Sequence, residues 1–153
     1  MKTKFILLFA CICALMASCT SQPTPSRAEK IRTQLLTCDE SNVIVVAHRA
    51  DWRNFPENSL EAIQSAIDMG VDMLEIDVQR AQDGVLILMH DQKLDRTTTG
   101  QGNIAETTWE EISKLNLKDH KGEVTSYKVP KLEDALLLCK DRIMINLDKA
   151  DRY

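Results

Sequence analysis

Two acidic residues, Glu75 and Asp77, stand two positions apart in an otherwise apolar stretch. In a β-strand alternate side chains share a face, so both carboxylates would project together while Leu74, Ile76 and Val78 pack on the other side. Neighbouring carboxylates are costly to bury unless a metal or a basic group compensates their charge. An oxygen-preferring divalent ion, Mg²⁺ or Ca²⁺, would satisfy both. The same alternation also fits an edge strand with one solvated face and no chemical role.

Pairs of ionisable residues directly follow three other apolar runs: His48-Arg49 after 43–47, His90-Asp91 after 85–89, and Asp148-Lys149 after 142–147. In parallel α/β folds the carboxyl ends of the strands converge on the active site. Asp148 would complete an anionic cage with Glu75 and Asp77 for a hard divalent ion. The strand-end placement therefore predicts one shared site.

The other residue types suggest the chemistry of that site. Arg49 offers a planar fork for phosphate oxygens. Histidine is the usual side chain for acid/base work near neutral pH, so one of His48 and His90 could remove a proton from a nucleophile while the other protonates a leaving oxygen. Asp91 is better suited to orienting His90 than to binding metal. Together these side chains indicate metal-assisted cleavage of a phosphate ester. Each also has a plainer explanation, such as an ion pair between Arg49 and Glu57 or a surface position for Lys149.

Periodicity predicts the elements that would position these residues. The β-branched run 43–47 predicts a strand covered on both faces, as in a parallel sheet. A helix capped by Asn58 and ended by Gly70 follows, and residues 71–79 form the next strand. Strand, helix and strand with short links predict a βαβ unit.

The rest of the chain continues the α/β pattern, in the following order: a strand over 85–89, an exposed loop over 92–103, a helix with the capping box Thr108 and Glu111, a helix from Pro130 that buries Leu132, Ala135, Leu136 and Cys139, and a last strand over 142–147. We detect no internal repeat and no second long apolar span. These elements predict an α/β fold.

The first residues have the layout of a secretory signal. Lys2 and Lys4 precede a short apolar run, and residues 15–19 resemble a bacterial lipobox in which Cys19 becomes the lipidated first residue. We therefore expect a lipoprotein signal peptide over 1–18, a flexible polar tether over 19–38 and a folded part over 39–153. Such a chain would be exported by a bacterium and held in the periplasm or at the outer membrane. An ordinary cleaved signal is the alternative.

Charge and cysteine content exclude several classes. Without residues 1–18 the chain has 17 basic and 23 acidic residues, a net charge of about −6, and no basic stripe for nucleic acid. Outside the signal and lipobox only Cys38 and Cys139 remain, which cannot form a disulfide framework, and Cys139 has the spacing of a core residue. We expect a small-molecule substrate and a membrane held through a lipid, but no nucleic acid partner.

The ordered motifs resemble the glycerophosphodiester phosphodiesterase family. The resemblance covers residues 43–150 and is carried by these strings: His48-Arg49, Pro56-Glu57-Asn58-Ser59, Glu75-Ile76-Asp77-Val78, Asp83-Gly84, His90-Asp91, Leu94-Asp95-Arg96-Thr97-Thr98 and Val129-Pro130-Lys131-Leu132-Glu133. It implies an α/β fold of the (β/α)₈ TIM barrel family. Such a barrel runs to about 250 residues, so this chain is expected to be an amino-terminal part covering roughly the first half.

The resemblance also implies an activity and residue roles. The activity is metal-dependent hydrolysis of glycerophosphodiesters to an alcohol and sn-glycerol 3-phosphate, through attack of a glycerol hydroxyl on phosphorus. His48 and His90 would be the acid/base pair and Arg49 a phosphate ligand. The metal ligands would be Glu75, Asp77 and Asp148, with Glu57, Asp91 and Lys149 in supporting positions.

The sequence departs from the family pattern at three positions: Ala50 follows His-Arg where Gly is usual, Ser59 replaces Thr, and Asp148 replaces Glu. Ala50 would be strained if the backbone there has a positive φ. Two other functions fit the same residues: a phosphodiesterase for another lipid head group, and a catalytically silent surface lipoprotein that binds phosphodiesters.

Overall fold

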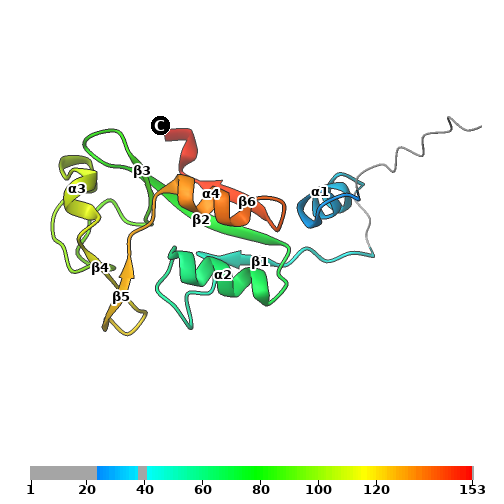
Figure 1. Ribbon diagram of the computed structural model, residues 1–153, viewed down its shortest axis with the longest axis horizontal. Coiled ribbons are helices and arrows are strands. Elements are labelled where there is room, and N and C mark those ends of the chain that lie inside the picture. Colours follow the sequence, from blue (N-terminus) through cyan, green and yellow to red (C-terminus); the bar gives the residue numbers. More distant parts are fainter. Residues whose placement is uncertain (1–23, 38–40, 153) are drawn as a thin grey trace, which may run out of the picture.

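The computed structural model describes residues 24–37 and 41–152 (Figure 1). Its elements in chain order are α1 Arg27–Thr37, β1 Val46–His48, α2 Leu60–Asp68, β2 Met73–Arg80, β3 Leu86–Leu88, η1 Ile104–Glu106, α3 Trp109–Ile112, β4 Asn116–Lys118, β5 Val124–Lys128, α4 Leu132–Cys139, β6 Met144–Asp148 and η2 Ala150–Arg152. The predicted signal over 1–18, Cys19 and Cys38 lie outside the described residues. Within the described ranges, no helix is both long and apolar enough to cross a bilayer.

Strand β2 is the centre of a parallel sheet. It pairs with β1 along one edge, where His48 lies opposite Glu75, and with β6 along the other, where Asp77 lies opposite Asp148. The sequence β1–α2–β2 confirms the predicted βαβ unit, and the strands predicted over 71–79 and 142–147 are β2 and β6. This register brings the carboxyl ends of three strands to one edge of the sheet.

Strand β1 differs from its prediction. The run 43–47 was expected to be covered on both faces, but Val43, Val45 and Val46 are 83%, 51% and 48% exposed. Within the described residues β1 pairs only with β2, and Ala47 is the member of the strand that packs against the core. Apolar composition indicates a strand but does not specify how many of its faces are covered.

Helix α2 begins one residue later than expected. Ser59, not Asn58, is its N-cap, because the Ser59 hydroxyl accepts a hydrogen bond from the Ala62 N–H at 3.0 Å. Asn58 has a positive φ of 60° and its side chain turns to β2 instead. The helix ends before Gly70, as predicted, and Gly70 has a φ of 79°.

Helix α4 follows Pro130 as predicted and packs beside α2. Ala135 and Cys139 are buried, and burial raises the pKa of the Cys139 thiol to about 11, as expected of a core cysteine. Leu136 was expected in the core but is 42% exposed, because the buried face of this helix is centred on Ala135 and Cys139. The first core therefore lies between the parallel sheet and the helices α2 and α4.

A second hydrophobic core lies beyond the far half of β2. There β2 pairs antiparallel with β3, and the hairpin β4–β5 and the helix α3 complete the lobe (Figure 1). The capping box of Thr108 and Glu111 is present as predicted. The hairpin was not predicted. The loop over 92–103, predicted to be exposed, buries Leu94 and Thr98 because its chain folds back over this core.

Helix α1 lies within the segment 19–38 that was predicted to be a flexible tether. Ile31 is 3% exposed, and the Arg27 guanidinium donates to the carbonyl oxygens of Gly70, Val71 and Arg142. The tether prediction is therefore wrong for residues 27–37, which dock on the folded part. Arginine bonds to main-chain carbonyls leave no periodic apolar pattern, so this contact could not be predicted from periodicity.

Candidate active site

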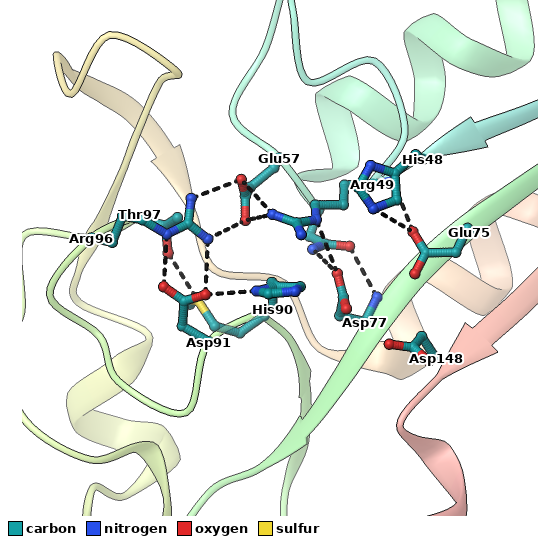
Figure 2. Close-up of polar contacts among 12 residues, drawn as sticks. His48, Arg49, Glu57, Glu75, Asp77, His90, Asp91, Arg96, Thr97 and Asp148 are labelled. Atoms are coloured by element: carbon teal, nitrogen blue, oxygen red, sulfur yellow. Dashed lines mark hydrogen bonds and ion pairs between the residues drawn. The ribbon is translucent and has the colours of Figure 1, made fainter.

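Three acidic side chains gather where β6 ends and where its parallel pairing with β2 ends, at Asp77 and Asp148 (Figure 2). One oxygen each of Glu75, Asp77 and Asp148 lies within 4.8 Å of the other two. The alternation on β2 is as predicted, with Leu74, Ile76 and Val78 buried. The alternative for this strand was an edge strand with one face in solvent. Asp77 is only 1% exposed, so that alternative is wrong at Asp77. Three carboxylates at this spacing are a donor set that suits a hard divalent cation.

Asp77 is held by a lysine and an amide. The Lys149 ammonium donates to Asp77 Oδ1, and the Asn58 amide donates to Oδ2 at 2.9 Å. Burial opposes ionisation of Asp77, but these hydrogen bonds outweigh it and lower the pKa of the carboxyl below its ordinary value. Lys149 also lies 3.4 Å from Asp148 Oδ2 and donates to the His90 carbonyl at 3.2 Å. Lys149 is thus central to the site and not a surface lysine.

Asn58 is a site residue that the sequence analysis missed. Its side chain is 2% exposed, and its carbonyl oxygen accepts the Asp77 N–H at 3.1 Å while its amide binds the Asp77 carboxylate. Asn58 therefore fixes the loop before α2 to the acidic strand. The asparagine looked like a helix cap because Asn favours both caps and left-handed turns.

The turn after β1 brings main chain to Glu75. The Arg49 N–H donates to Glu75 Oε2 at 3.0 Å, and His48 Nε2 lies 3.8 Å from the same oxygen. Arg49 and Ala50 have φ values of 53° and 61°, both left-handed. The expected conflict at Ala50 is therefore real, since a residue with a Cβ is strained in this region.

A stability comparison tests this strain. Ala50→Gly removes a buried methyl, which destabilises the fold, but it also removes the strain of a left-handed residue that has a Cβ, about 1–2 kcal/mol. The two effects oppose each other, so we expect the free energy of unfolding of this variant to differ from that of the parent by less than about 1 kcal/mol. Ala66→Gly removes an equally buried methyl from helix α2, where glycine is unfavourable, and should lose about 2 kcal/mol. Urea unfolding measures both values, and equal losses would show that Ala50 is unstrained.

A chain of ion pairs links the phosphate-binding candidate to a histidine (Figure 2). Arg49 Nη1 lies 3.3 Å from both oxygens of Glu57, and Arg96 donates to the same carboxylate at 2.7 and 3.0 Å. Arg96 also donates to Asp91 at 2.7 and 3.0 Å. Asp91 Oδ1 lies 2.6 Å from His90 Nδ1. Asp91 is therefore in contact with the His90 ring, as its predicted role requires, and Arg96 is a second residue that the sequence analysis did not place in the site.

The two carboxyls in this chain are kept ionised by the arginines. Burial disfavours the charged form of Glu57, but bonds from Arg96 and Arg49 outweigh it and lower its pKa. The Arg96 guanidinium holds the pKa of Asp91 well below its usual range, with a further contribution from His90. An ionised Asp91 can only accept hydrogen bonds, so His90 must donate through Nδ1. The neutral His90 imidazole is then fixed in the tautomer that leaves Nε2 without a proton.

These lowered pKa values predict acid sensitivity. Glu57, Asp77 and Asp91 have folded pKa values below their ordinary values of 4.5, 3.8 and 3.8, so the unfolded chain binds more protons at low pH. Their stabilisation is complete above the ordinary values and is lost as pH falls through the folded values. Urea unfolding from neutral pH downward should show a falling free energy of unfolding that starts near pH 4.5.

Two single substitutions provide the control for this acid loss. Glu57→Gln removes one of the three carboxyls and should make the loss with pH shallower. Glu110→Gln removes a carboxyl of an 83% exposed surface pair and should leave the slope unchanged. An equal slope in both variants and the parent chain would contradict the assignment.

A small cavity of about 180 Å³ lies beside these groups, lined by His48, Arg49, Trp52 and Glu57. Arg49 Nε is buried and has no hydrogen-bond partner within the described part of the chain, although it lies 3.8 Å from Asp77 Oδ2. A cationic N–H left in this condition is a ready donor for an anionic ligand. The cavity therefore offers one arginine donor and one histidine next to the three carboxylates.

The described part of the chain is a mixed α/β fold consistent with part of a (β/α)₈ barrel, with an acidic cluster where the parallel pairing of β2 and β6 ends. Residues 48–151 match the sequence pattern of the glycerophosphoryl diester phosphodiesterase family. The chain belongs to that family, and the predicted fold class is confirmed.

Individual relatives agree with this assignment. A glycerophosphodiester phosphodiesterase of Caldanaerobacter subterraneus is 38% identical over 107 residues, which are 69% of this chain and 44% of the relative. The crystal structure of a glycerophosphoryl diester phosphodiesterase from Parabacteroides distasonis superposes with a TM-score of 0.69 at 33% identity, over 74% of this chain and 40% of that one. The structure of an Oleispira antarctica phosphodiesterase in complex with the product sn-glycerol-3-phosphate superposes with a TM-score of 0.61 at 29% identity, over 69% of this chain and 43% of that one. The chain thus spans less than half the length of these relatives.

Proposed function

We propose that the protein to which this chain belongs hydrolyses glycerophosphodiesters to an alcohol and sn-glycerol 3-phosphate. The observation that carries the proposal is the placement of Arg49, His48 and His90 beside three clustered carboxylates in a chain of this family. The product bound by the Oleispira antarctica phosphodiesterase supports the same substrate class.

Glu75, Asp77 and Asp148 are the residues that would hold a divalent metal. Their carboxylate oxygens are the donors that Mg²⁺ and Ca²⁺ prefer, and their spacing allows each to offer one oxygen to a common ion. When bound, such an ion polarises phosphoryl oxygens and lowers the barrier to attack. Asp148 is one methylene shorter than the Glu usual in the family, and separate titrations with Mg²⁺ and Ca²⁺ identify the ion that this shorter side chain favours.

The chain's own side chains supply the remaining steps. Arg49 binds phosphate oxygens through its guanidinium, and Glu57, 3.3 Å from Nη1, holds that group beside the cavity. One histidine removes the proton of the glycerol hydroxyl that attacks phosphorus, and the other protonates the alkoxide of the alcohol that leaves. Water then attacks the resulting cyclic phosphate and one P–O bond of the ring breaks, which gives sn-glycerol 3-phosphate. His90 has its ring fixed by Asp91, whereas the His48 side chain is 64% exposed at the cavity.

The test is an assay of the full-length protein that contains this chain, with glycerophosphocholine in the presence of Mg²⁺, Ca²⁺ or EDTA and with glycerol 3-phosphate measured as product. We expect turnover that needs a divalent ion and that falls by about 10²-fold or more in His48→Ala. Turnover of a different diester only would favour another head group. Metal binding without turnover of any diester would favour a binding lipoprotein and overturn the hydrolase.

We also propose that Cys19 carries a lipid that holds the protein at a bacterial membrane, in the periplasm or at the outer membrane. The support is the basic start, the short apolar run and the small residues before Cys19. Labelling of cells with a fatty-acid analogue should mark the parent chain and the control Cys139→Ser, but not Cys19→Ser. Equal labelling of Cys19→Ser would refute the anchor.

A further inference from the structure

One guanidinium binds two carboxylates at once. Arg96 Nη1 and Nη2 donate to Glu57 at 3.0 and 2.7 Å, and Arg96 Nε and Nη2 donate to Asp91 at 2.7 and 3.0 Å. Both contacts are bidentate, so the planar fork is used on two of its edges. A lysine ammonium carries the same charge but cannot present two parallel pairs of donors.

Each of these carboxylates holds a different reacting group. Asp91 contacts His90 Nδ1 at 2.6 Å, and Glu57 contacts Arg49 Nη1 at 3.3 Å. Arg96 therefore lies between the candidate acid/base residue and the candidate phosphate ligand, and Figure 2 shows the unbroken row of contacts. The two ends come from different parts of the fold, because Glu57 precedes α2 on the first core and Asp91 follows β3 beside the second.

The main chain that carries Arg96 is itself fixed. The neighbouring Thr97 and Thr98 are 5% and 0% exposed. The Thr97 hydroxyl contacts the Met89 sulfur at 2.9 Å, and the Thr98 hydroxyl donates to the Leu94 carbonyl at 2.7 Å. A side chain that starts from such an anchored loop can position its partners, although its own exposure is close to half.

We propose that Arg96 is a positioning residue that sets the tautomer of His90 through Asp91 and the orientation of Arg49 through Glu57. This inference rests on the proposed function for its kinetic part only. Without the Arg96 guanidinium, Asp91 loses the two hydrogen-bond donors that fix the plane of its carboxylate. The hydrogen bond between Asp91 and His90 Nδ1 is then no longer held in one orientation. Glu57 would at the same time be bound by Arg49 alone, so the Arg49 guanidinium would be held less firmly in the orientation that binds phosphate.

The decisive variant is Arg96→Lys, which keeps the charge and removes the double fork. Nitrogen NMR of the metal-free chain, which has three histidines, should show His90 as the Nδ1–H tautomer in the parent and as a mixture of tautomers in Arg96→Lys. In the assay, kcat should fall by about 10–100-fold, the usual effect of losing a residue that orients a reacting side chain. KM should rise as well, because Arg49 is less well held.

Arg142→Lys is the matched control. Arg142 also joins separate elements, through Gln64 and the Leu138 carbonyl, but it lies outside the site. It should leave the His90 tautomer and kcat unchanged. An unaltered His90 signal in Arg96→Lys, or kinetics equal to those of Arg142→Lys, would overturn the positioning role.

A second variant covers the case in which Arg96→Lys does not fold. Asp91→Asn keeps the shape of the side chain but removes its charge and one of its two acceptor oxygens, so it weakens both the bond to His90 and the double contact with Arg96 and should also give mixed His90 tautomers. A pure Nδ1–H signal in Asp91→Asn would reject the same assignment. If the parent chain hydrolysed no diester, the proposed hydrolase would fail, whereas the NMR comparison would still decide the role of Arg96.

Discussion

Glu75→Gln is expected to abolish divalent-ion binding at the acidic cluster and to lower kcat/KM for glycerophosphocholine by about 10³-fold. The substitution keeps the shape of the side chain and an oxygen that can accept the Arg49 N–H, so the turn after β1 should persist. What it removes is one of the three anionic oxygens that lie within 4.8 Å of one another. A hard ion bound to two carboxylates in place of three is held less tightly and neutralises less charge on the phosphoryl group.

Calorimetric titration with Mg²⁺ and Ca²⁺, beside the activity assay, measures both effects. Glu110→Gln is the control, because it also changes one carboxylate to an amide but does so on an exposed surface pair. Glu75→Gln and Glu110→Gln should unfold at similar urea concentrations. If Glu75→Gln bound the metal as tightly as the parent and retained full activity, the acidic cluster would not be the metal site.

His90→Gln has the second large effect, a fall in kcat of about 10²–10⁴-fold, which is the usual contribution of a positioned acid or base. Glutamine can still donate to Asp91, so the row of ion pairs through Arg96 should remain. The glutamine cannot exchange a proton near neutral pH, so one limb of the pH profile of kcat should disappear. The effect on KM should be small, since His90 is not the phosphate ligand in this assignment.

Added imidazole distinguishes loss of a proton carrier from loss of structure. The His90 side chain is 35% exposed, so a free imidazole can approach its position. Recovery of part of the activity, with kcat depending on the imidazole concentration, supports the acid/base role. A parent-like pH profile in His90→Gln would contradict it.

The strand ends could be predicted because each depends on a local pattern. Glu75 and Asp77 alternate with apolar residues, and Asp148 directly ends a strand, so the parallel arrangement alone places them at one edge. The parts of the site that were missed depend on distant partners. Asn58 bonds to Asp77 and Arg96 bonds to Glu57, at sequence separations of 19 and 39 residues. Periodic patterns in a sequence do not indicate contacts between residues so far apart.

The fold, like the site, has parts that local sequence patterns predict and parts that depend on contacts between distant residues. The βαβ unit, the capping box at Thr108 and the buried Cys139 follow from short-range rules and were predicted. Strand β5 of the hairpin alternates exposed with partly buried residues and β4 is only three residues long, so the periodicity of these strands was too weak to predict them. Helix α1 docks through one arginine and one isoleucine, which is too small an apolar face to distinguish it from a polar linker.

Lys149 has a consequence for the energetics of the acidic cluster. Its ammonium donates to Asp77 and lies beside Asp148, so the folded chain carries its own counter-ion among the carboxylates. It therefore offsets part of the negative charge of the cluster. A divalent cation that took Asp77 Oδ1 as a ligand would have to displace this ammonium, so the affinity of the cluster for a metal would depend on Lys149 as well as on the three carboxylates.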